Sequence, residues 1–436
     1  MRSVFLSLAL TSLLPVIAIA APKNIIYMIG DGMGPSYVAA YRYYQHQPDQ
    51  TKVANTVFDD LLTGMASTYP DDDTLVTDSA AGATALATGV KSYNGAISVN
   101  RQHIPIGTMM QLAKRLGKTN GIVASSQVNH ATPASFLAHS NSRRNMNDIA
   151  DMYLDYRIDG KPVADLIIGG GSKYFARQDR NLIEGFSALG YQYTDNFLQL
   201  DSITRLPALA LLSEDALPAA LNSEVVNMLA TLTDKALQLL SGADNGFVLM
   251  IEGSQIDWCG HDNDIACAMA EMHDFAQAIQ VARAYVDANP DTLLIITADH
   301  ETGGLSLGAN GVYQWRTEVI RKVKATGRAI AQQLRKLENQ QDISKRFTEL
   351  TGLSLNKAQL HLLLTALKNE DEKIGLGQIV QFISEASLTG WTSGGHTAAD
   401  VPVMAYGKNA SEFNGFMDNT AIAKKLIQYI QQTQPH

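Results

Sequence analysis

Cysteine is nearly absent from this sequence of 436 residues, which contains only Cys259 and Cys267. So low a count excludes a small disulfide scaffold, because such folds depend on several bridges. The two cysteines lie close together in the sequence. They can form one short-loop disulfide or remain two buried thiols on a helix, and the sequence leaves both alternatives open.

Positive charge and long apolar segments are also scarce. The chain has 34 Lys and Arg against 43 Asp and Glu, which gives a formal net charge of −9. This balance disfavours binding to nucleic acid or to an anionic membrane, and bound divalent cations would offset part of it. Beyond the first twenty residues, no stretch is long and apolar enough to cross a bilayer.

Residues 1–20 have the pattern of a secretory signal peptide. Arg2 supplies the positive start, residues 4–14 the apolar segment, and residues 18–20 a small-residue cleavage pattern before Ala21. A membrane anchor is the alternative, but the apolar segment is short and is interrupted by Pro15. We therefore expect a mature chain that is periplasmic or secreted and has no membrane anchor.

The remaining apolar runs are typical of strands buried on both faces of a sheet. They comprise residues 24–30, 121–124, 165–168, 247–251, 292–297 and 401–406. Helical patterns separate them, the longest at residues 265–288. This alternation predicts an α/β fold with a central, mostly parallel sheet covered by helices on both faces.

Residues 313–386 depart from the alternation, because they form amphipathic helical patterns without a strand. With no internal repeat or low-complexity linker, the economical interpretation is one catalytic domain of residues 21–436 that contains a helical subdomain at 313–386. We interpret this segment as a helical insertion that faces solvent. The alternative is a functional role, either as a lid over the site or as a dimer contact.

Polar side chains with metal-binding capacity follow several predicted strands: Asp31, His130, Glu252, Asp299 and His300. Because ligands bind at the carboxyl ends of parallel strands, these residues are expected to form one site. Further ligand types occur in a short predicted loop holding Asp257 and His261, and among small residues around His396. His and Asp suit Zn²⁺, whereas the oxygen ligands of Asp31, Thr132 and Glu252 suit Mg²⁺.

Ser79 begins an alanine-rich stretch that is expected to be helical. Asp78 is a suitable N-cap and Gly89 a suitable C-terminal stop. A serine in the first turn lies where the free N–H groups favour an anion. There is no obvious general base beside Ser79, so a metal would have to activate its hydroxyl.

These segments resemble the signature segments of alkaline phosphatases, in the family's order and over nearly the whole mature chain. They are residues 31–34, 76–84, 252–257, 297–300 and 395–397. The resemblance implies two zinc ions and one magnesium ion. The first zinc would be held by Asp257, His261 and His396, the second by Asp31, Asp299 and His300, and the magnesium by Asp31, Thr132 and Glu252.

The resemblance also implies a two-step hydrolysis of small phosphate monoesters, at alkaline pH. Ser79 would attack the phosphorus while Arg143 holds the phosphate, with Arg144 as the alternative neighbour. The alcohol would leave from the first zinc, and water on that zinc would hydrolyse the phosphoserine. Such an enzyme scavenges phosphate. The family is mostly dimeric, so a homodimer is conceivable, although the sequence does not fix it.

His130 and Trp258 stand where some bacterial members of the family carry Asp and Lys, and the pair resembles marine bacterial members. Close to the bound phosphate, they are expected to loosen magnesium binding and to speed phosphate release. The rival functions are a phosphodiesterase, sulfatase or phosphonate hydrolase of the same superfamily, and a binding protein without turnover. Ser79 together with Thr132 and Glu252 favours a monoesterase.

Overall fold

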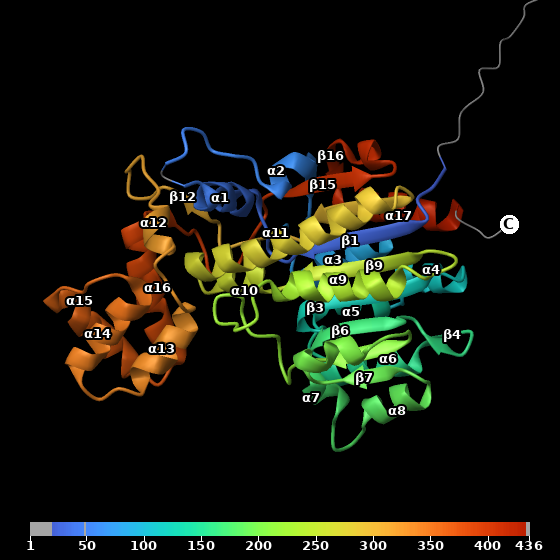
Figure 1. Ribbon diagram of the computed structural model, residues 1–436, viewed down its shortest axis with the longest axis horizontal. Helices are drawn as coiled ribbons and strands as arrows, with labels where there is room; N and C mark the ends of the chain where they lie inside the picture. Colours follow the sequence, from blue (N-terminus) through green and yellow to red (C-terminus); the bar gives the residue numbers. More distant parts are fainter. Residues whose placement is uncertain (1–19, 48, 433–436) are drawn as a thin grey trace, which may run out of the picture.

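The structure is a computed structural model, and it describes residues 20–47 and 49–432 (Figure 1). Apart from Ala20, the predicted signal peptide lies outside the described residues. Within the described part of the chain, no helix is both long and apolar enough to span a bilayer.

A ten-stranded sheet forms the centre of the molecule. Its strands lie in the order β16 (Gly415–Asp418), β2 (Leu62–Ser67), β15 (Val401–Gly407), β10 (Thr292–Thr297), β1 (Asn24–Gly30), β9 (Phe247–Gly253), β3 (Thr119–Gln127), β6 (Leu166–Gly170), β8 (Ala208–Leu211) and β7 (Gln192–Thr194). From β10 to β7 all neighbours are parallel. The α/β fold with a mostly parallel sheet is therefore confirmed.

The central strands are buried on both faces, as their uninterrupted apolar sequences predict. Every residue of β1, β9 and β10 is buried. One helical layer contains α1 (Pro35–Gln45), α2 (Val57–Leu61), α9 (Met228–Leu240) and α11 (Ile265–Ala288). The other contains α3 (Ser79–Thr88), α4 (Met109–Arg115), α5 (Ala131–Leu137) and α17 (Asn419–Gln432), so that α9 and α11 lie in front of the sheet and α3 and α5 behind it (Figure 1).

Strand β15 differs in direction from the repeating pattern suggested by the sequence. It pairs antiparallel with both β10 and β2. Its first residue, Val401, therefore lies at the edge of the sheet where the parallel strands end. Because His396 precedes Val401 by only a few residues, this reversal brings His396 to the same edge as Asp31 and Asp299.

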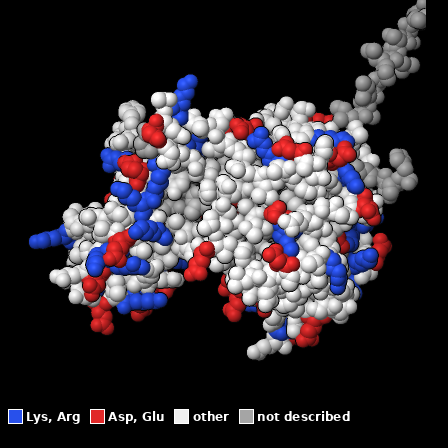
Figure 2. Space-filling model, in the orientation of Figure 1, with Lys and Arg blue, Asp and Glu red and all other residues white. Residues whose placement is uncertain are grey.

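The segment expected to be helical consists of α12 (Thr317–Ile320), α13 (Gly327–Arg335), α14 (Gln340–Thr351), α15 (Lys357–Leu367) and α16 (Glu372–Ser387). No strand lies between α12 and α16 in this fully described part of the chain. These helices form a projection at one end of the molecule, and Figure 2 shows Lys and Arg side chains on it, interspersed with Asp and Glu. We refer to residues 313–386 as the helical insertion; its boundaries as a subdomain stay a prediction.

The two cysteines form a disulfide that joins α10 (Gln255–His261) to the first turn of α11. Replacing both Cys259 and Cys267 by serine is expected to lower the free energy of unfolding by about 2–3 kcal/mol, because the bridge restricts a short loop in the unfolded chain. Urea unfolding monitored by circular dichroism measures this difference. Wild-type protein in reducing buffer should unfold like the double variant, and equal midpoints for the oxidised wild type and the variant would contradict the expectation.

Candidate active site

Ser79 lies in the first turn of α3, in the position that the sequence predicts. The Asp78 carboxylate accepts hydrogen bonds from the Ala81 and Gly95 backbone N–H groups, at 3.0 Å each. Gly89 ends the helix in the left-handed conformation, with φ of 72°. The small residues have a packing role, since a Cβ at Gly82 would approach the Asp299 carbonyl oxygen to 2.8 Å. Helix α3 can therefore contact the loop that carries Asp299 and His300.

The predicted ligands at the strand ends converge. Asp31 follows β1, Asp299 and His300 follow β10, and His130 is the N-cap of α5 after β3. Glu252 is the penultimate residue of β9 rather than a residue beyond it, and it pairs in register with Ile29 of β1. Asp31, Glu252, Asp299 and His300 are all fully buried.

Asp257 and His261 do not lie in a loop, as the sequence suggested, but on helix α10. Residues four apart in a helix share one face, so both side chains point to the same side. His396 belongs to β14 (His396–Thr397), which pairs antiparallel with β11 (Glu301–Thr302) directly after His300. These two short elements bring Asp257, His261 and His396 together next to the buried residues.

The first ligand group consists of Asp257, His261 and His396, whose ligand atoms lie within 4.8 Å of one another. The Asp257 carboxylate is 3.3 Å from His261 Nε2 and 3.5 Å from His396 Nε2. Each histidine donates its Nδ1–H to a carbonyl oxygen at 2.8 Å, that of Gly394 or of Thr77. These bonds leave both Nε2 atoms, 3.1 Å apart, as lone-pair donors facing the same point.

The second ligand group consists of Asp31, Asp299 and His300. His300 Nε2 lies 3.3 Å from an oxygen of each carboxylate and 3.1 Å from the Ser79 hydroxyl oxygen. A single ring nitrogen cannot form three good hydrogen bonds, whereas four converging donor atoms match the shell of a cation. Burial holds the pKa of His300 well below its usual value, so this ring is neutral and able to bind a metal.

The third ligand group consists of Asp31, Glu252 and His130. Thr132 donates its hydroxyl to Asp31 Oδ2 at 3.4 Å, so the predicted oxygen ligands also meet here. Burial raises the pKa of Glu252 to about 7 and, together with Arg143, lowers the pKa of His130 to about 3. The sequence placed His130 outside the set of metal ligands. In the structure, one of its ring nitrogens lies within 4.8 Å of the Asp31 and Glu252 oxygens.

Buried polar atoms without partners test whether the residues fit metal ions. Among the described residues, Asp31 Oδ1, Asp299 Oδ2 and Glu252 Oε1 are buried and lack any hydrogen-bond partner. Such atoms are rare in proteins unless an ion or a water molecule satisfies them. Burial and the neighbouring carboxylates of Asp299 and Asp257 also raise the pKa of Asp31. The second and third groups thus fit divalent cations by these orphaned atoms, and the first group fits by its converging imidazole and carboxylate atoms.

Arg143 faces the site, whereas Arg144 is exposed. The Arg143 guanidinium donates to Asp78 Oδ2 at 3.0 Å and to His130 Nε2 at 3.3 Å. Trp258 packs edge-on against the His130 ring, with 5.8 Å between the ring centroids. Both residues singled out for their departure from other bacterial sequences therefore contact each other beside Arg143.

Sequence reasoning missed Thr302. Its hydroxyl donates to Asp257 Oδ1 at 2.5 Å and lies 3.2 Å from His300 Nδ1, so it connects the first and second ligand groups. Tyr37 in turn donates its hydroxyl to the Thr302 carbonyl oxygen at 2.7 Å. The only signal in the sequence was the position of Thr302 two residues after His300.

Comparison with known proteins identifies the family. The family model described as alkaline phosphatase matches residues 22–432. The chain belongs to the alkaline phosphatase family. Alkaline phosphatase 3 of Bacillus subtilis is 42% identical over 411 residues, covering 94% of this chain and 89% of that protein. The cold-active alkaline phosphatase of a psychrophilic Shewanella sp. is 47% identical, with a TM-score of 0.88, and the match covers 93% of this chain and 99% of that one.

These similarities establish the class of reaction. The protein is a hydrolase of phosphate monoesters, as an alkaline phosphatase is, and the family depends on metal ions. The alkaline phosphatase of the Antarctic bacterium TAB5 shares the fold at 28% identity and a TM-score of 0.71, over 94% of this chain and 99% of that one. The resemblance read from the sequence segments is confirmed.

Proposed function

We propose that the protein hydrolyses phosphate monoesters through a covalent phosphoserine at Ser79, with optimal activity at alkaline pH. One observation carries this proposal: the Ser79 hydroxyl oxygen lies 3.1 Å from His300 Nε2, the atom on which the second ligand group converges. The Ser79 oxygen therefore lies close enough to the second ligand group to bind the same metal ion. Located outside the cytoplasm, such an enzyme would release phosphate for uptake.

The three ligand groups would hold two zinc ions and one magnesium ion. Asp257, His261 and His396 suit the first zinc, and Asp31, Asp299 and His300 the second. Asp31, Thr132 and Glu252 suit magnesium. When bound, these cations lower the pKa values of the serine hydroxyl and of a water molecule and stabilise charge on the entering and departing oxygens.

The protein's own residues position the phosphate. The forked guanidinium of Arg143 binds two phosphate oxygens, and Asp78 and His130 fix its orientation. The Ser79 oxygen attacks the phosphorus from the side of the second ligand group, and the alcohol departs on the opposite side. Water then attacks the phosphoserine from the side vacated by the alcohol, and this step returns the serine hydroxyl and releases phosphate.

Arg143→Ala is expected to reduce kcat/KM for a phosphate monoester roughly 10²-fold, because two charge-assisted hydrogen bonds to phosphate are lost. Inhibition by inorganic phosphate should weaken in parallel, and steady-state kinetics measures both. Arg144→Ala is the matched control, since this side chain is exposed on the same loop. Equal losses in the two variants would contradict the assignment of Arg143.

Trp258→Lys is expected to strengthen inhibition by inorganic phosphate about tenfold, because a cation would replace a neutral indole beside Arg143 and His130. The inhibition constant of phosphate measures the effect. Trp258→Phe retains an uncharged ring and should leave the constant near that of the wild type. An unchanged constant in the lysine variant would rule out a role for this position in phosphate release.

His130 is proposed to loosen magnesium at the third group, because an imidazole replaces a carboxylate that would attract the hard cation. Structures of TAB5 alkaline phosphatase variants that carry glutamate or aspartate in place of a histidine are described with magnesium bound in the M3 site. A carboxylate in such a position is therefore compatible with magnesium in a relative, which supports this role for His130.

A further inference from the structure

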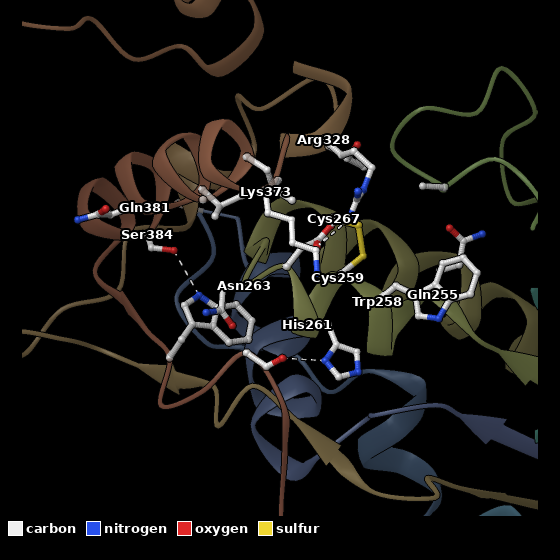
Figure 3. Close-up of a pocket in the computed structure, with 18 of the residues that line it drawn as sticks. Gln255, Trp258, Cys259, His261, Asn263, Cys267, Arg328, Lys373, Gln381 and Ser384 are labelled. Carbon is white, nitrogen blue, oxygen red and sulfur yellow. Dashed lines mark hydrogen bonds and ion pairs between the residues drawn. A yellow bond between two sulfur atoms is a disulfide. The ribbon is translucent and has the colours of Figure 1, made fainter. Parts of the chain in front are cut away.

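A cleft of about 1280 Å³ separates the helical insertion from α10 (Figure 3). Helices α13 and α16 form one wall, α10 and residues 215–222 form the other, and residues 389–394 close one end. In Figure 3, Lys373 and Ser384 of α16 lie across this space from Trp258 and His261 of α10. In the proposed mechanism the catalytic residues bind only the phosphate group, so the mechanism gives this cleft no role.

The cleft adjoins the catalytic groups on the side toward which the alcohol departs. From Ser79 the path passes to His300, whose ring stacks on that of His396 at 3.6 Å between centroids. His396 Nε2 is 3.1 Å from His261 Nε2, and His261 lines the cleft. Since an in-line displacement expels the alcohol away from the nucleophile, the group attached to phosphate would point toward His261 and the cleft that His261 lines.

The lining offers flat aromatic surfaces and amide groups. Trp258 and Trp391 are both partly exposed. Trp391 is held in place, because its Nε1 donates to Ser384 Oγ at 3.2 Å and its ring lies 6.4 Å from that of Tyr37. Amide side chains on the lining include Gln127, whose Oε1 is buried without a hydrogen-bond partner, and Asn310, whereas the amides of Asn222, Gln255 and Gln381 donate to groups within the protein. Aromatic faces with amide donors and acceptors match ring systems that carry hydroxyl groups.

The charges of the cleft are mostly compensated within the protein. Arg328 Nη2 donates to both Asp262 carboxylate oxygens at 2.9 Å, and Asp215 forms an ion pair with Lys173. Lys373, which is exposed, is the one lining cation without an ion pair among the described residues. An uncharged, hydroxylated group therefore matches the cleft better than a second phosphate.

We propose that this cleft binds the alcohol part of the substrate and favours phosphate monoesters of nucleosides or sugars over those of small alcohols. The proposal rests on the proposed phosphomonoesterase function. It assigns the helical insertion a part in substrate selection, since residues of α16 and Arg328 of α13 line one side of the cleft.

Gly377→Trp tests the proposal by filling the cleft. Gly377 lines it from α16, and a Cβ added there would meet no atom within 4 Å. In this variant, kcat/KM is expected to fall about tenfold or more for adenosine 5′-monophosphate or glucose 6-phosphate and to stay unchanged for ethyl phosphate. Gln378→Trp, on the same helix but outside the lining, should resemble the wild type for all three substrates.

A binding measurement separates the cleft from turnover. In a Ser79→Ala background, calorimetry with adenosine 5′-monophosphate or glucose 6-phosphate should show tighter binding than with inorganic phosphate, and Gly377→Trp should remove this difference. A loss for either the nucleotide or the sugar phosphate supports the proposal and identifies which group binds. Equal effects of Gly377→Trp on all three substrates, or none, would overturn it. If the wild type hydrolysed none of them, the phosphomonoesterase function itself would fail.

Discussion

Ser79→Ala is expected to lower kcat for phosphate monoesters by at least about 10³-fold, because among residues 20–47 and 49–432 no other hydroxyl lies within hydrogen-bond distance of His300 Nε2. The loss should appear in kcat more than in KM, since Arg143 and the ligand groups that hold phosphate remain. A chromogenic phosphate monoester at alkaline pH measures the rate. The metal content of the variant should equal that of the wild type.

The phosphoserine provides a direct test of the same residue. Wild-type protein incubated with radiolabelled phosphate and quenched in acid should retain covalent label, whereas Ser79→Ala should retain none. Thr84→Ala is a suitable control, because Thr84 is a buried hydroxyl residue of the same helix that donates to the Ala96 carbonyl oxygen. Turnover by Ser79→Ala within tenfold of the wild type would exclude Ser79 as the nucleophile.

Removal of divalent cations by a chelator is expected to abolish activity and to lower the free energy of unfolding by about 4 kcal/mol, the value for a ligand present at a thousand times its dissociation constant. The physical reason is the buried cluster of Asp31, Glu252 and Asp299, whose carboxylates repel one another without cations. Activity assays and thermal unfolding, each with metal content measured by emission spectroscopy, test both effects.

Readdition should distinguish the ligand groups. Zinc is expected to restore most of the activity, because the first and second groups consist only of imidazole nitrogens and Asp oxygens, whereas the third also contains the Glu252 carboxylate. Magnesium alone should restore little, and magnesium added after zinc should increase the rate further. Full activity in protein shown to be free of metal would contradict the assignment of all three groups.

Sequence patterns predicted the buried strands and the long helix closely. The apolar runs at 24–30 and 292–297 are strands with those bounds, and the helical spacing at 265–288 coincides with α11. These elements can be predicted because an uninterrupted apolar run indicates a strand buried on both faces, and apolar residues at helical spacing indicate a helix. Helix α10 was missed, because Trp258, Cys259 and Gly260 are poor helix formers and the helix depends on the packing around it.

The sequence by itself determined the chemistry of this protein: which carboxylates, imidazoles and hydroxyl groups are available, and that most of them follow buried strands. The tertiary structure alone decided the distances between them. The reversal of β15 and the pairing of β14 with β11 bring together segments that are far apart in the chain. The disulfide between α10 and α11 decides between the two alternatives that the sequence left open for the cysteines. The cleft beside the helical insertion is also formed by segments that are far apart in the chain. Packing between distant segments leaves no periodic signal in the sequence, so only the tertiary structure reveals the cleft.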